Sequence, residues 1–366
     1  MKRVLLSALV LSVAAMGTQA KSWKIGPSSV NGMDFASIND AVESEKVAAG
    51  DTLFLDQYYS TNTKQIVTKK VVIIGTGYDT SFTDEQVVAT LTDSLTLKVD
   101  GIQVKSVKLN NVKFYADECV LDRCYVNAIG IANVPKGLNH IYSCYITGPV
   151  GGQVSVKTIT NSISGATTTT YHNAQFDIQN CVFRPTTNFS TFVYCLTNSI
   201  INNNTFYYTY NTNSHYYCLG DITNSQISNN IIHWWNSYTS NSNYTGAHCM
   251  TSQVYAVGSG NSIEHNIMSQ SVSSTYPHNL NSSNIASLFV STGNFSDYYK
   301  LKTDVTDNFA LNYATDGKEV GCHGGMFGCP SGGRPQFVPY FTKVVVGQRT
   351  ENGKLPVSLE VKIQDK

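Results

Sequence analysis

The chain has 366 residues, with 25 Lys and Arg against 25 Asp and Glu, so its formal net charge is zero and only 14% of its residues are charged. Proteins that bind nucleic acid use a basic face to neutralise phosphates, and this balance disfavours a nucleic-acid partner. Beyond the first twenty residues no apolar run is long enough to cross a bilayer, so we expect no membrane span.

The first twenty residues have the pattern of a secretory signal peptide. Lys2 and Arg3 precede an apolar run from Val4 to Met16, and Thr18-Gln19-Ala20 provides a small-residue cleavage site. The run is too short to cross a membrane as a helix. We therefore expect cleavage near Ala20 and a mature chain that is secreted, periplasmic or held on the outer cell surface.

The next predicted elements are a short helix and two strands. The segment Asp34–Val42 has apolar residues on one helical face, with Asp34 as the expected N-cap. A turn at Ala49-Gly50-Asp51 leads into predicted strands at Thr52–Asp56 and Val71–Gly77.

From there onward a six-residue pattern, aliphatic–x–x–polar–x–apolar, returns nine times. A fixed pattern that returns through variable spacers indicates a solenoid, and the spacings near 20 residues suit one coil of a parallel β-helix. The nine segments are Leu109–Phe114, Leu121–Val126, Ile141–Ile146, Ile159–Ser164, Ile178–Phe183, Ile201–Phe206, Ile227–Ile232, Ile263–Met268 and Val305–Ala310.

The fourth position of this pattern is expected to form an inward column along the axis of the stack. Asn tolerates the left-handed backbone of a tight bend, and its amide can bond to the Asn above and below. Cys would fill the same slot as a small buried group. The alternative is that the pattern arises by chance in an Asn-rich chain. The nine residues are Val112, Cys124, Cys144, Ser162, Cys181, Asn204, Asn230, Asn266 and Asn308.

The order of helix, GDT strand and VVIIGTG strand at residues 34–77 resembles the N-terminal cap of the pectin-lyase-like parallel β-helix family. The tail, from Asp316 to Gly325 (DGKEVGCHGG) and on to Val361–Gln364, is similar to that of secreted β-helix proteins of gut Bacteroidetes without assigned activity. These resemblances imply an all-β fold, a single-stranded right-handed parallel β-helix with a short N-terminal capping helix. We expect one domain at 21–366, with caps at 34–60 and 311–366 and coils at 71–310.

Two further features of the chain leave alternatives open. Tyr194, Tyr217 and Tyr255 align before successive repeats, and such a column either packs in the core or offers a platform for sugar rings. The nine cysteines are an odd number, and we expect mostly buried thiols. Cys322 and Cys329, in a Gly-rich loop, are the best candidates for a disulfide.

The long insertions between the later repeats combine aromatic rings with Asn and His, a mixture that suits carbohydrate because rings stack on sugar faces and amides bond hydroxyl groups. The alternative is that these rings pack the loops onto the solenoid. The candidate carbohydrate-binding residues are Tyr207, Tyr208, His233, Trp234, Trp235 and Tyr238.

Candidate catalytic residues are few. Residues 185–299 contain no Lys or Arg, although a lyase acting on uronate polymers needs cations or a metal to stabilise its anionic intermediate. Arg184 lies just before this stretch and keeps a lyase site on earlier coils open. Asp221 and Glu264 lie on consecutive coils and would serve a glycosidase if they faced each other. The resembled family's calcium-binding Asp and catalytic Arg pattern is absent, so its catalytic residues cannot be carried over.

The sequence therefore predicts a secreted or envelope-associated protein whose partner is a poly- or oligosaccharide, most simply a neutral glycan. The alternatives are a polysaccharide lyase or glycoside hydrolase, and a structural or adhesive surface protein. No zinc-type, phosphate-binding or EF-hand motif is present, so we expect neither a metal nor a cofactor.

Overall fold

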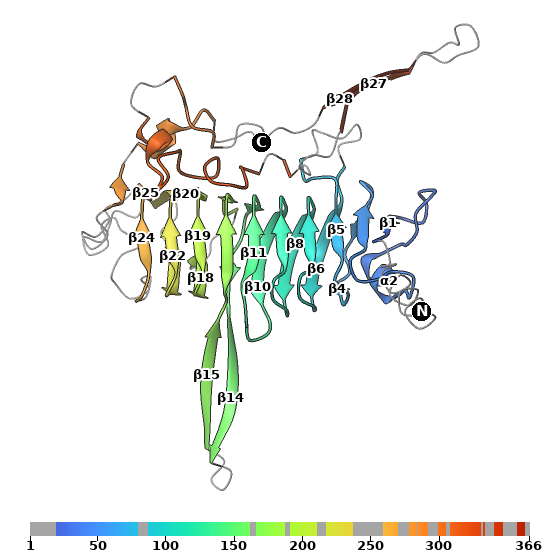
Figure 1. Ribbon diagram of the computed structural model, residues 1–366, viewed down its shortest axis with the longest axis horizontal. Helices are drawn as coiled ribbons and strands as arrows, with labels where there is room; N and C mark the ends of the chain where they lie inside the picture. The colour runs from blue at the N-terminus through green and yellow to red at the C-terminus, as the bar shows by residue number, and fades with distance from the viewer. Residues whose placement is uncertain are drawn as a thin grey trace, which may run out of the picture.

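In the computed structural model the chain forms an all-β, solenoid-like stack of parallel strands (Figure 1). The structure describes residues 20–79, 87–161, 166–186, 191–210, 217–236, 259–269, 278–282, 284–291, 299–304, 308–330, 332–333, 340–346 and 357–362. The predicted signal peptide lies outside these residues except for Ala20. Among the described residues no helix is both long and apolar enough to span a bilayer.

One face of the stack is a ten-stranded parallel sheet. Its order along the axis follows the order in the chain, as expected when each coil contributes one strand. The strands are β1 (Ser22–Ile25), β2 (Thr52–Leu55), β5 (Val72–Ile74), β7 (Gln103–Lys105), β9 (Val120–Asp122), β11 (Asn139–Tyr142), β16 (Phe176–Gln179), β19 (Ile200–Asn202), β22 (Gln226–Ser228) and β24 (Ser262–Glu264).

The rest of the stack is a fourteen-stranded sheet, also built from parallel pairs. It divides at β10, where Tyr125 pairs with β12 and Ile129 pairs with β13. Its strands are β3 (Ser60–Thr61), β4 (Gln65–Val67), β6 (Thr90–Leu97), β8 (Lys108–Phe114), β10 (Tyr125–Ile131), β12 (Tyr145–Ile146), β13 (Val150–Gly151), β17 (Val182–Phe183), β18 (Thr191–Thr197), β20 (Thr205–Tyr210), β21 (Tyr217–Thr223), β23 (Ile231–Asn236), β25 (Ile267–Met268) and β26 (Leu280–Asn281).

The core lies between these sheets, because side chains alternate across each strand and the inward set is apolar. In the ten-stranded sheet the register places one buried aliphatic residue of each coil above the last. That column consists of Leu53, Ile73, Val104, Leu121, Ile141, Ile178, Ile201, Ile227 and Ile263.

The N-terminal end of the stack carries the helix α2 (Ile38–Glu43), as Figure 1 shows. Its N-cap is Ser37, whose hydroxyl accepts a hydrogen bond from the backbone N–H of Asp40 at 3.0 Å. The predicted N-cap, Asp34, is wrong because its carboxylate instead accepts from the N–H of Lys24 at 2.8 Å. Ile38 and Val42 are buried in the core, so the helix closes apolar surface at this end.

The predicted inward column is present and stacks coil upon coil. The N–H of Cys181 donates to Oδ1 of Asn204 at 2.9 Å, and the N–H of Asn204 donates to Oδ1 of Asn230 at 2.8 Å. Asn266 continues the column in the same way, and Asn279 ends it.

Three of the nine predicted repeats are wrong. Val112 pairs with Ile129, five residues after Cys124, so Val112 is not the column residue of its coil. The register aligns Val107 with Cys124 and Val104 with Leu121, so this repeat begins at Val104. Ser162 falls outside the described residues, and its segment begins in the antiparallel hairpin of β14 (Gln153–Asn161) and β15 (Ala166–Asn173), which projects from the stack in Figure 1.

The ninth repeat also fails to join the column. The side chain of Asn308 bonds to the backbone carbonyls of Leu288 and Lys302 and caps the short 3-10 helix η3 (Phe309–Asn312). The segment before it contains a second 3-10 helix, η2 (Ile285–Leu288).

The left-handed backbone conformation occurs one residue before the fourth position of the pattern, where it was predicted. From Val107 to Asn266, the residue that precedes the column residue has a φ between 51° and 59°, and the column residue itself turns inward. We call these preceding residues the turn ridge: Ser106, Arg123, Ser143, Asn180, Asn203, Asn229 and His265.

A segment near the C-terminus, residues 313–330 with 332 and 333, runs back along the turn ridge, and we call it the C-terminal strap (Figure 1). Thr315 bonds to Asn229, Phe327 accepts from Arg123, and the N–H of Tyr78 donates to Gly332. The predicted C-terminal cap at 311–366 is therefore in part a segment that covers one side of the solenoid. The strands β27 (Tyr340–Val346) and β28 (Val357–Lys362) pair with each other.

Candidate functional site

The structure places three of the predicted carbohydrate-binding residues in the interior. Tyr207, Tyr208 and His233 are only 9%, 4% and 7% exposed. The ring of Tyr207 lies 4.7 Å from that of His233 and 5.1 Å from that of Tyr299, a residue of the segment that covers them. Tyr207 and His233 therefore pack the covering segment onto the solenoid, whereas Tyr208 belongs to the main core. None of the three side chains is exposed enough in this structure to support the predicted sugar contact.

The remaining members of that set stay predictions. Trp234 and Trp235 belong to β23, where their backbone pairs with Tyr208 and Thr209, but their side chains lie outside the described residues. Tyr238 also lies outside the described residues.

The predicted aromatic column before the later repeats is not formed. Tyr194 pairs with Gly220, and the partner of Tyr217 is Thr191, three residues earlier. Tyr255 lies outside the described residues.

The acidic pair proposed for a glycosidase is also not formed. Asp221 lies on β21 in the fourteen-stranded sheet, and Glu264 lies on β24 in the ten-stranded sheet. Arg184 follows β17, and its backbone N–H donates to the carbonyl of Ile146. The structure brings none of these three residues together.

The outer face of the ten-stranded sheet instead gathers a different set of ionisable groups. The register places Tyr142 beside Asp122 on one side and Gln179 on the other, while His140 lies beside Asp177. We call Glu118, His140, Tyr142, Asp177 and Gln179 the histidine cluster.

Hydrogen bonds and a charge contact join the members of this cluster across three consecutive coils. The Tyr142 hydroxyl donates to Oδ2 of Asp177 at 2.5 Å, and it lies 2.7 Å from Nδ1 of His140. Gln179 donates to the other oxygen of Asp177 at 2.7 Å. On the opposite side of the imidazole, Nε2 of His140 is 3.5 Å from a carboxylate oxygen of Glu118. The imidazole therefore lies between two carboxylates.

The electrostatics of the cluster favour a charged His140. The hydrogen bond to Asp177 raises the pKa of His140, although burial acts in the opposite direction. Burial pushes the pKa of Asp177 upward, but hydrogen bonds from His140, Tyr142 and Gln179 outweigh it and hold that pKa below its usual value. Burial, with the nearby Asp177, raises the pKa of Tyr142, which remains a neutral donor. Such a cluster can hold and exchange a proton at Nε2 of His140 beside Glu118.

A second candidate site is a pocket of about 270 Å³ on the outer face of the fourteen-stranded sheet, which we call the tyrosine pocket. Its side chains come from β6, β8, β10 and the segments after β12 and β17, and none of them is acidic. It is lined by Thr90, Leu91, Thr92, Lys108, Leu109, Asn110, Tyr125, Asn127, Thr147 and Thr186.

Two side-chain amides among the lining residues form a connected row. Asn110 donates to the carbonyl of Thr92 at 2.9 Å, and Asn127 donates to Oδ1 of Asn110 at 3.0 Å. The ring of Tyr125 stacks on that of Tyr145 with centroids 5.5 Å apart, and the ammonium of Lys108 lies 5.7 Å from the Tyr125 centroid. A ring fixed beside oriented amides can receive a ligand with one apolar face and several hydroxyl groups.

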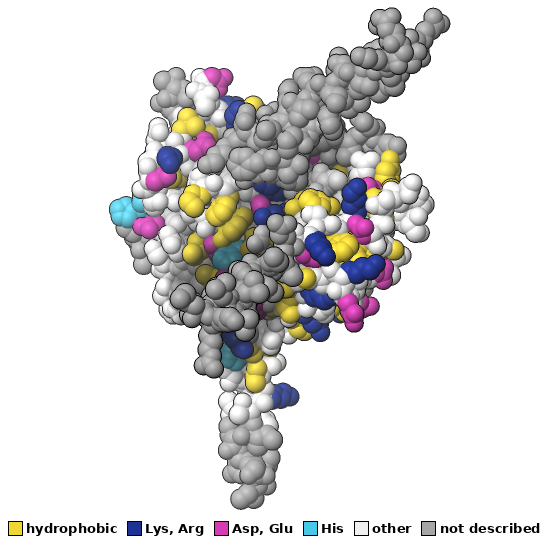
Figure 2. Space-filling model, turned by 45° about the vertical axis from the view of Figure 1, so that its right-hand side comes forward, with side chains coloured by type: hydrophobic (Ala, Val, Ile, Leu, Met, Phe, Trp, Pro, Cys, Tyr) yellow, Lys and Arg dark blue, Asp and Glu magenta, His cyan; other side chains and the backbone are white. Residues whose placement is uncertain are grey.

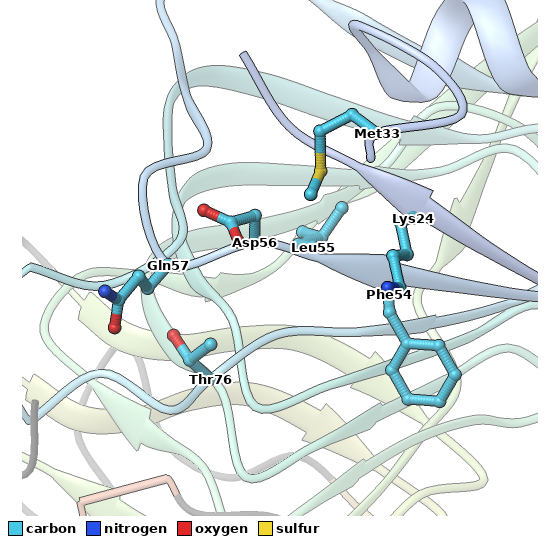
Figure 3. A pocket seen from close by; sticks show the side chains of 7 residues that line it. All are labelled: Lys24, Met33, Phe54, Leu55, Asp56, Gln57 and Thr76. Carbon is cyan, nitrogen blue, oxygen red and sulfur yellow. The ribbon is translucent and has the colours of Figure 1, made fainter. Parts of the chain in front are cut away.

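A third hollow, of about 340 Å³, lies at the N-terminal end of the stack (Figure 3). Lys24 and Phe54 from adjacent strands, Asp56, Gln57 and Thr76 are among its lining residues, and Figure 3 shows the Phe54 ring pointing away from Gln57 and Thr76. Because the Phe54 ring points away from Gln57 and Thr76, this hollow lacks the arrangement of the tyrosine pocket, in which a ring lies beside amide groups.

Basic and acidic side chains are interspersed on the face shown in Figure 2, without a large area of one sign. Within the described residues, one group of three could ligate a metal: Cys322, His323 and Cys329, whose ligand atoms lie within 4.8 Å of one another. The sequence prediction of no metal did not anticipate this group.

The sequence reasoning missed the histidine cluster and the tyrosine pocket. His140 and Asp177 are 37 residues apart because the β14–β15 hairpin separates their coils, so spacing alone did not pair them. A signal was available: once Ile141 and Ile178 are aligned as repeat positions, the residues just before them must be neighbours.

Comparisons with known proteins add no relative: no family model, no curated protein and no solved structure matches the chain.

Proposed function

We propose that the chain is a secreted or envelope-associated, right-handed parallel β-helix protein that binds neutral saccharide in the tyrosine pocket. The right-handed sense is proposed because connections between parallel strands of one sheet almost always have that hand. The observation that carries the proposed function is the ring of Tyr125 fixed beside the Asn110–Asn127 amide row in a pocket without carboxylates.

The chemistry of the pocket matches a sugar ring. Tyr145 lies against one side of the Tyr125 ring and the Lys108 ammonium lies over the other, so a sugar ring can pack on Tyr125 where Lys108 moves aside. The amides of Asn110 and Asn127 and the hydroxyl of Thr92 can then bond the hydroxyl groups of the sugar. The row of amides is held by neighbouring strands, so little side-chain entropy is lost when a ligand binds. A pocket of about 270 Å³ suits a small part of a longer chain more than a whole polysaccharide.

Binding to immobilised neutral and acidic polysaccharides tests this proposal. Replacing Tyr125 by Ala should weaken binding to a neutral glycan roughly tenfold, because a stacked ring contributes about 1 kcal/mol or more. The matched control is Tyr171→Ala, which removes a tyrosine that is 62% exposed on the hairpin. Equal binding by both variants, or binding restricted to acidic polysaccharides, would contradict the proposal.

The histidine cluster favours a second candidate function, cleavage of a polysaccharide by acid–base chemistry. His140 holds a proton between two carboxylates, and Glu118 reaches solvent with 65% of its side chain exposed. A lyase or a glycoside hydrolase needs groups of this kind.

Assays for new reducing ends and for unsaturated ends, on the polysaccharides that the protein binds, test this second candidate. A cleaving enzyme should lose at least a hundredfold of its activity in His140→Gln, because one acid–base group contributes about that much, and should keep its affinity for the glycan. Binding without any new chain ends would leave saccharide binding alone as the function.

A further inference from the structure

The C-terminal strap contains a short loop, residues 322–329, that begins and ends in a cysteine. The Sγ atoms of Cys322 and Cys329 are 2.6 Å apart, and both residues are buried. Between them lie His323, Gly324, Gly325, Met326, Phe327 and Gly328.

The carbonyl groups of this loop hold three successive coils of the solenoid. Ser143 donates its hydroxyl to the carbonyls of Phe327 and Gly328 at 3.1 and 2.8 Å, and Arg123 donates to that of Phe327 at 3.2 Å. The Asn180 amide donates to the carbonyls of Cys322 and Gly324. All three donors belong to the turn ridge, so the geometry of the loop decides whether they are satisfied.

The loop fits the turn ridge closely. A Cβ atom on Gly324 would lie 2.5 Å from Nδ2 of Asn203, and one on Gly325 would lie 2.9 Å from Oδ1 of the same residue. Gly325 and Gly328 also have φ values of 70° and 74°, which favour glycine. The ring of Phe327 stacks on that of Tyr142 at 3.9 Å, which connects the loop to the histidine cluster.

We propose that Cys322 and Cys329 form a disulfide that closes this loop and fastens the C-terminal strap to the turn ridge. The two S–H bonds break, an Sγ–Sγ bond forms, and a disulfide donor, small or protein, accepts the two electrons and two protons and leaves as two thiols. Because both sulfurs are buried once the loop is docked, the bond forms before docking and is then shielded from reductants.

The alternative occupant is a metal ion held by Cys322, His323 and Cys329. Two thiolates on one tetrahedral zinc, with Zn–S near 2.3 Å, would stand about 3.8 Å apart. The observed 2.6 Å is closer to a disulfide, near 2.05 Å, than to that arrangement.

Differential alkylation of the whole protein tests the proposal. The unreduced protein is denatured and treated with iodoacetamide, then reduced and treated with N-ethylmaleimide, and the peptides are mapped. Cys322 and Cys329 should carry only the second label, and Cys195, which is part-exposed, should carry the first. Labelling of both loop cysteines by iodoacetamide would overturn the proposal, and bound zinc at one equivalent with the same labelling would establish the metal site instead.

Local stability provides a second readout. Reduction of the wild-type protein should raise amide hydrogen exchange in residues 318–330 and lower the Tm by a few degrees. The same treatment should leave a Cys322→Ser/Cys329→Ser variant unchanged, while Cys195→Ser should respond as the wild type does. A wild-type protein insensitive to reductant, after mass analysis shows that all its cysteines are reduced, would contradict the fastening role.

Discussion

The inward column changes its chemistry halfway along the solenoid. In the later coils it consists of Asn204, Asn230, Asn266 and Asn279, and each amide makes the same two contacts with the preceding coil. For Asn230, Oδ1 accepts from the N–H of Asn204 at 2.8 Å and Nδ2 donates to the carbonyl of Ile201 at 2.8 Å. Every inward amide therefore satisfies one backbone N–H and one backbone carbonyl that would otherwise have no partner at the bend.

The earlier coils use Cys124, Cys144 and Cys181 in the same slot with the same connections. Sγ of Cys144 contacts the N–H of Cys124 at 3.4 Å and the carbonyl of Leu121 at 3.6 Å. Burial raises the pKa of Cys124 and Cys144 well above the usual value, so both remain thiols that can donate. The slot thus requires a group that donates and accepts at fixed positions, and sulfur does so more weakly than an amide.

The two halves carry different polar groups on the outside. Around the cysteine coils, polar bonds between coils come from the outer face, where Tyr142 and His140 contact Asp177, and from Arg123, Ser143 and Asn180 under the C-terminal strap. The asparagine coils also have outer contacts, where Ser228 and Asn229 bond to Asn202 and Asn229 bonds to Thr315 under the strap. We infer that the cysteine half depends more on its outer contacts, because its inward column is held by weaker bonds to sulfur.

The largest effect is expected when the asparagine column is interrupted. Replacing Asn230 by Leu leaves the N–H of Asn204 and the carbonyl of Ile201 buried without their partner, which should lower the free energy of unfolding by about 3–5 kcal/mol. Urea unfolding measures this change. Replacing the exposed Asn133 by Leu is the control, and an equal, small loss in both variants would contradict the inward amide bonds.

The next largest effect is expected in the pH dependence of the unfolding free energy, because His140 and Asp177 lie in the cysteine half. The pKa of His140 is raised, so its contribution to stability is complete below about pH 6.5 and is lost as pH rises through the folded pKa. The pKa of Asp177 is lowered, so its contribution is present above about pH 4 and is lost as pH falls through the folded pKa. Stability from this pair is therefore greatest between about pH 4 and 6.5.

Asp177→Asn should remove most of that pH dependence and cost about 1–3 kcal/mol near pH 6, measured by urea unfolding across the range. An unchanged pH profile in Asp177→Asn would show that the cluster does not hold these coils together.

A smaller effect is expected within the cysteine column. Cys144→Ala should cost about 1–2 kcal/mol, because the lost thiol contacts are long and the cavity is small. Cys144→Asn sharpens the comparison, since an amide in this slot has the same partners within reach. The Tm of Cys144→Asn should lie closer to that of the wild type than the Tm of Cys144→Ala does. The reverse order would mean that the cysteine coils leave too little room for an amide side chain at this position.

The smallest effect is expected from the β14–β15 hairpin. The N–H of Ala174 donates to the carbonyl of Gly152 at 3.0 Å, so the ends of the hairpin already meet where it leaves the stack. Replacing residues 153–173 by a two-residue link should change the free energy of unfolding by less than about 1 kcal/mol. A large loss would show that the hairpin is part of the solenoid core.

The column of the asparagine half could be predicted from the sequence, whereas the column of the first coils could not, and the reason is physical. Asn204, Asn230 and Asn266 each follow the same apolar residue by three positions, and an amide in that slot is hard to mistake. Val112 was assigned to the column because LNNVKF imitates the pattern, whereas the true column residue, Val107, follows Ser106 and carries no polar mark. Asn308 fits the pattern and yet caps a 3-10 helix.

The candidate sites could not be predicted for a different reason. Whether Tyr207 faces solvent depends on Phe289 and Tyr299, which lie more than eighty residues later and cover it. The tyrosine pocket depends on register, because Asn110 and Asn127 meet only when β8 and β10 are aligned correctly. The incorrect first repeat concealed that alignment.

A double-mutant cycle on Asn204 and Asn230 tests the central claim most directly, because it measures whether two residues 26 positions apart are axial neighbours joined by their amides. The unfolding free energies of Asn204→Ala, Asn230→Ala and the double variant are compared with the wild type. The stack predicts a coupling of about 1–2 kcal/mol for this pair, and additivity within about 0.5 kcal/mol for Asn204 with the distant Asn279. Additive effects for Asn204 and Asn230 would contradict the stacked column.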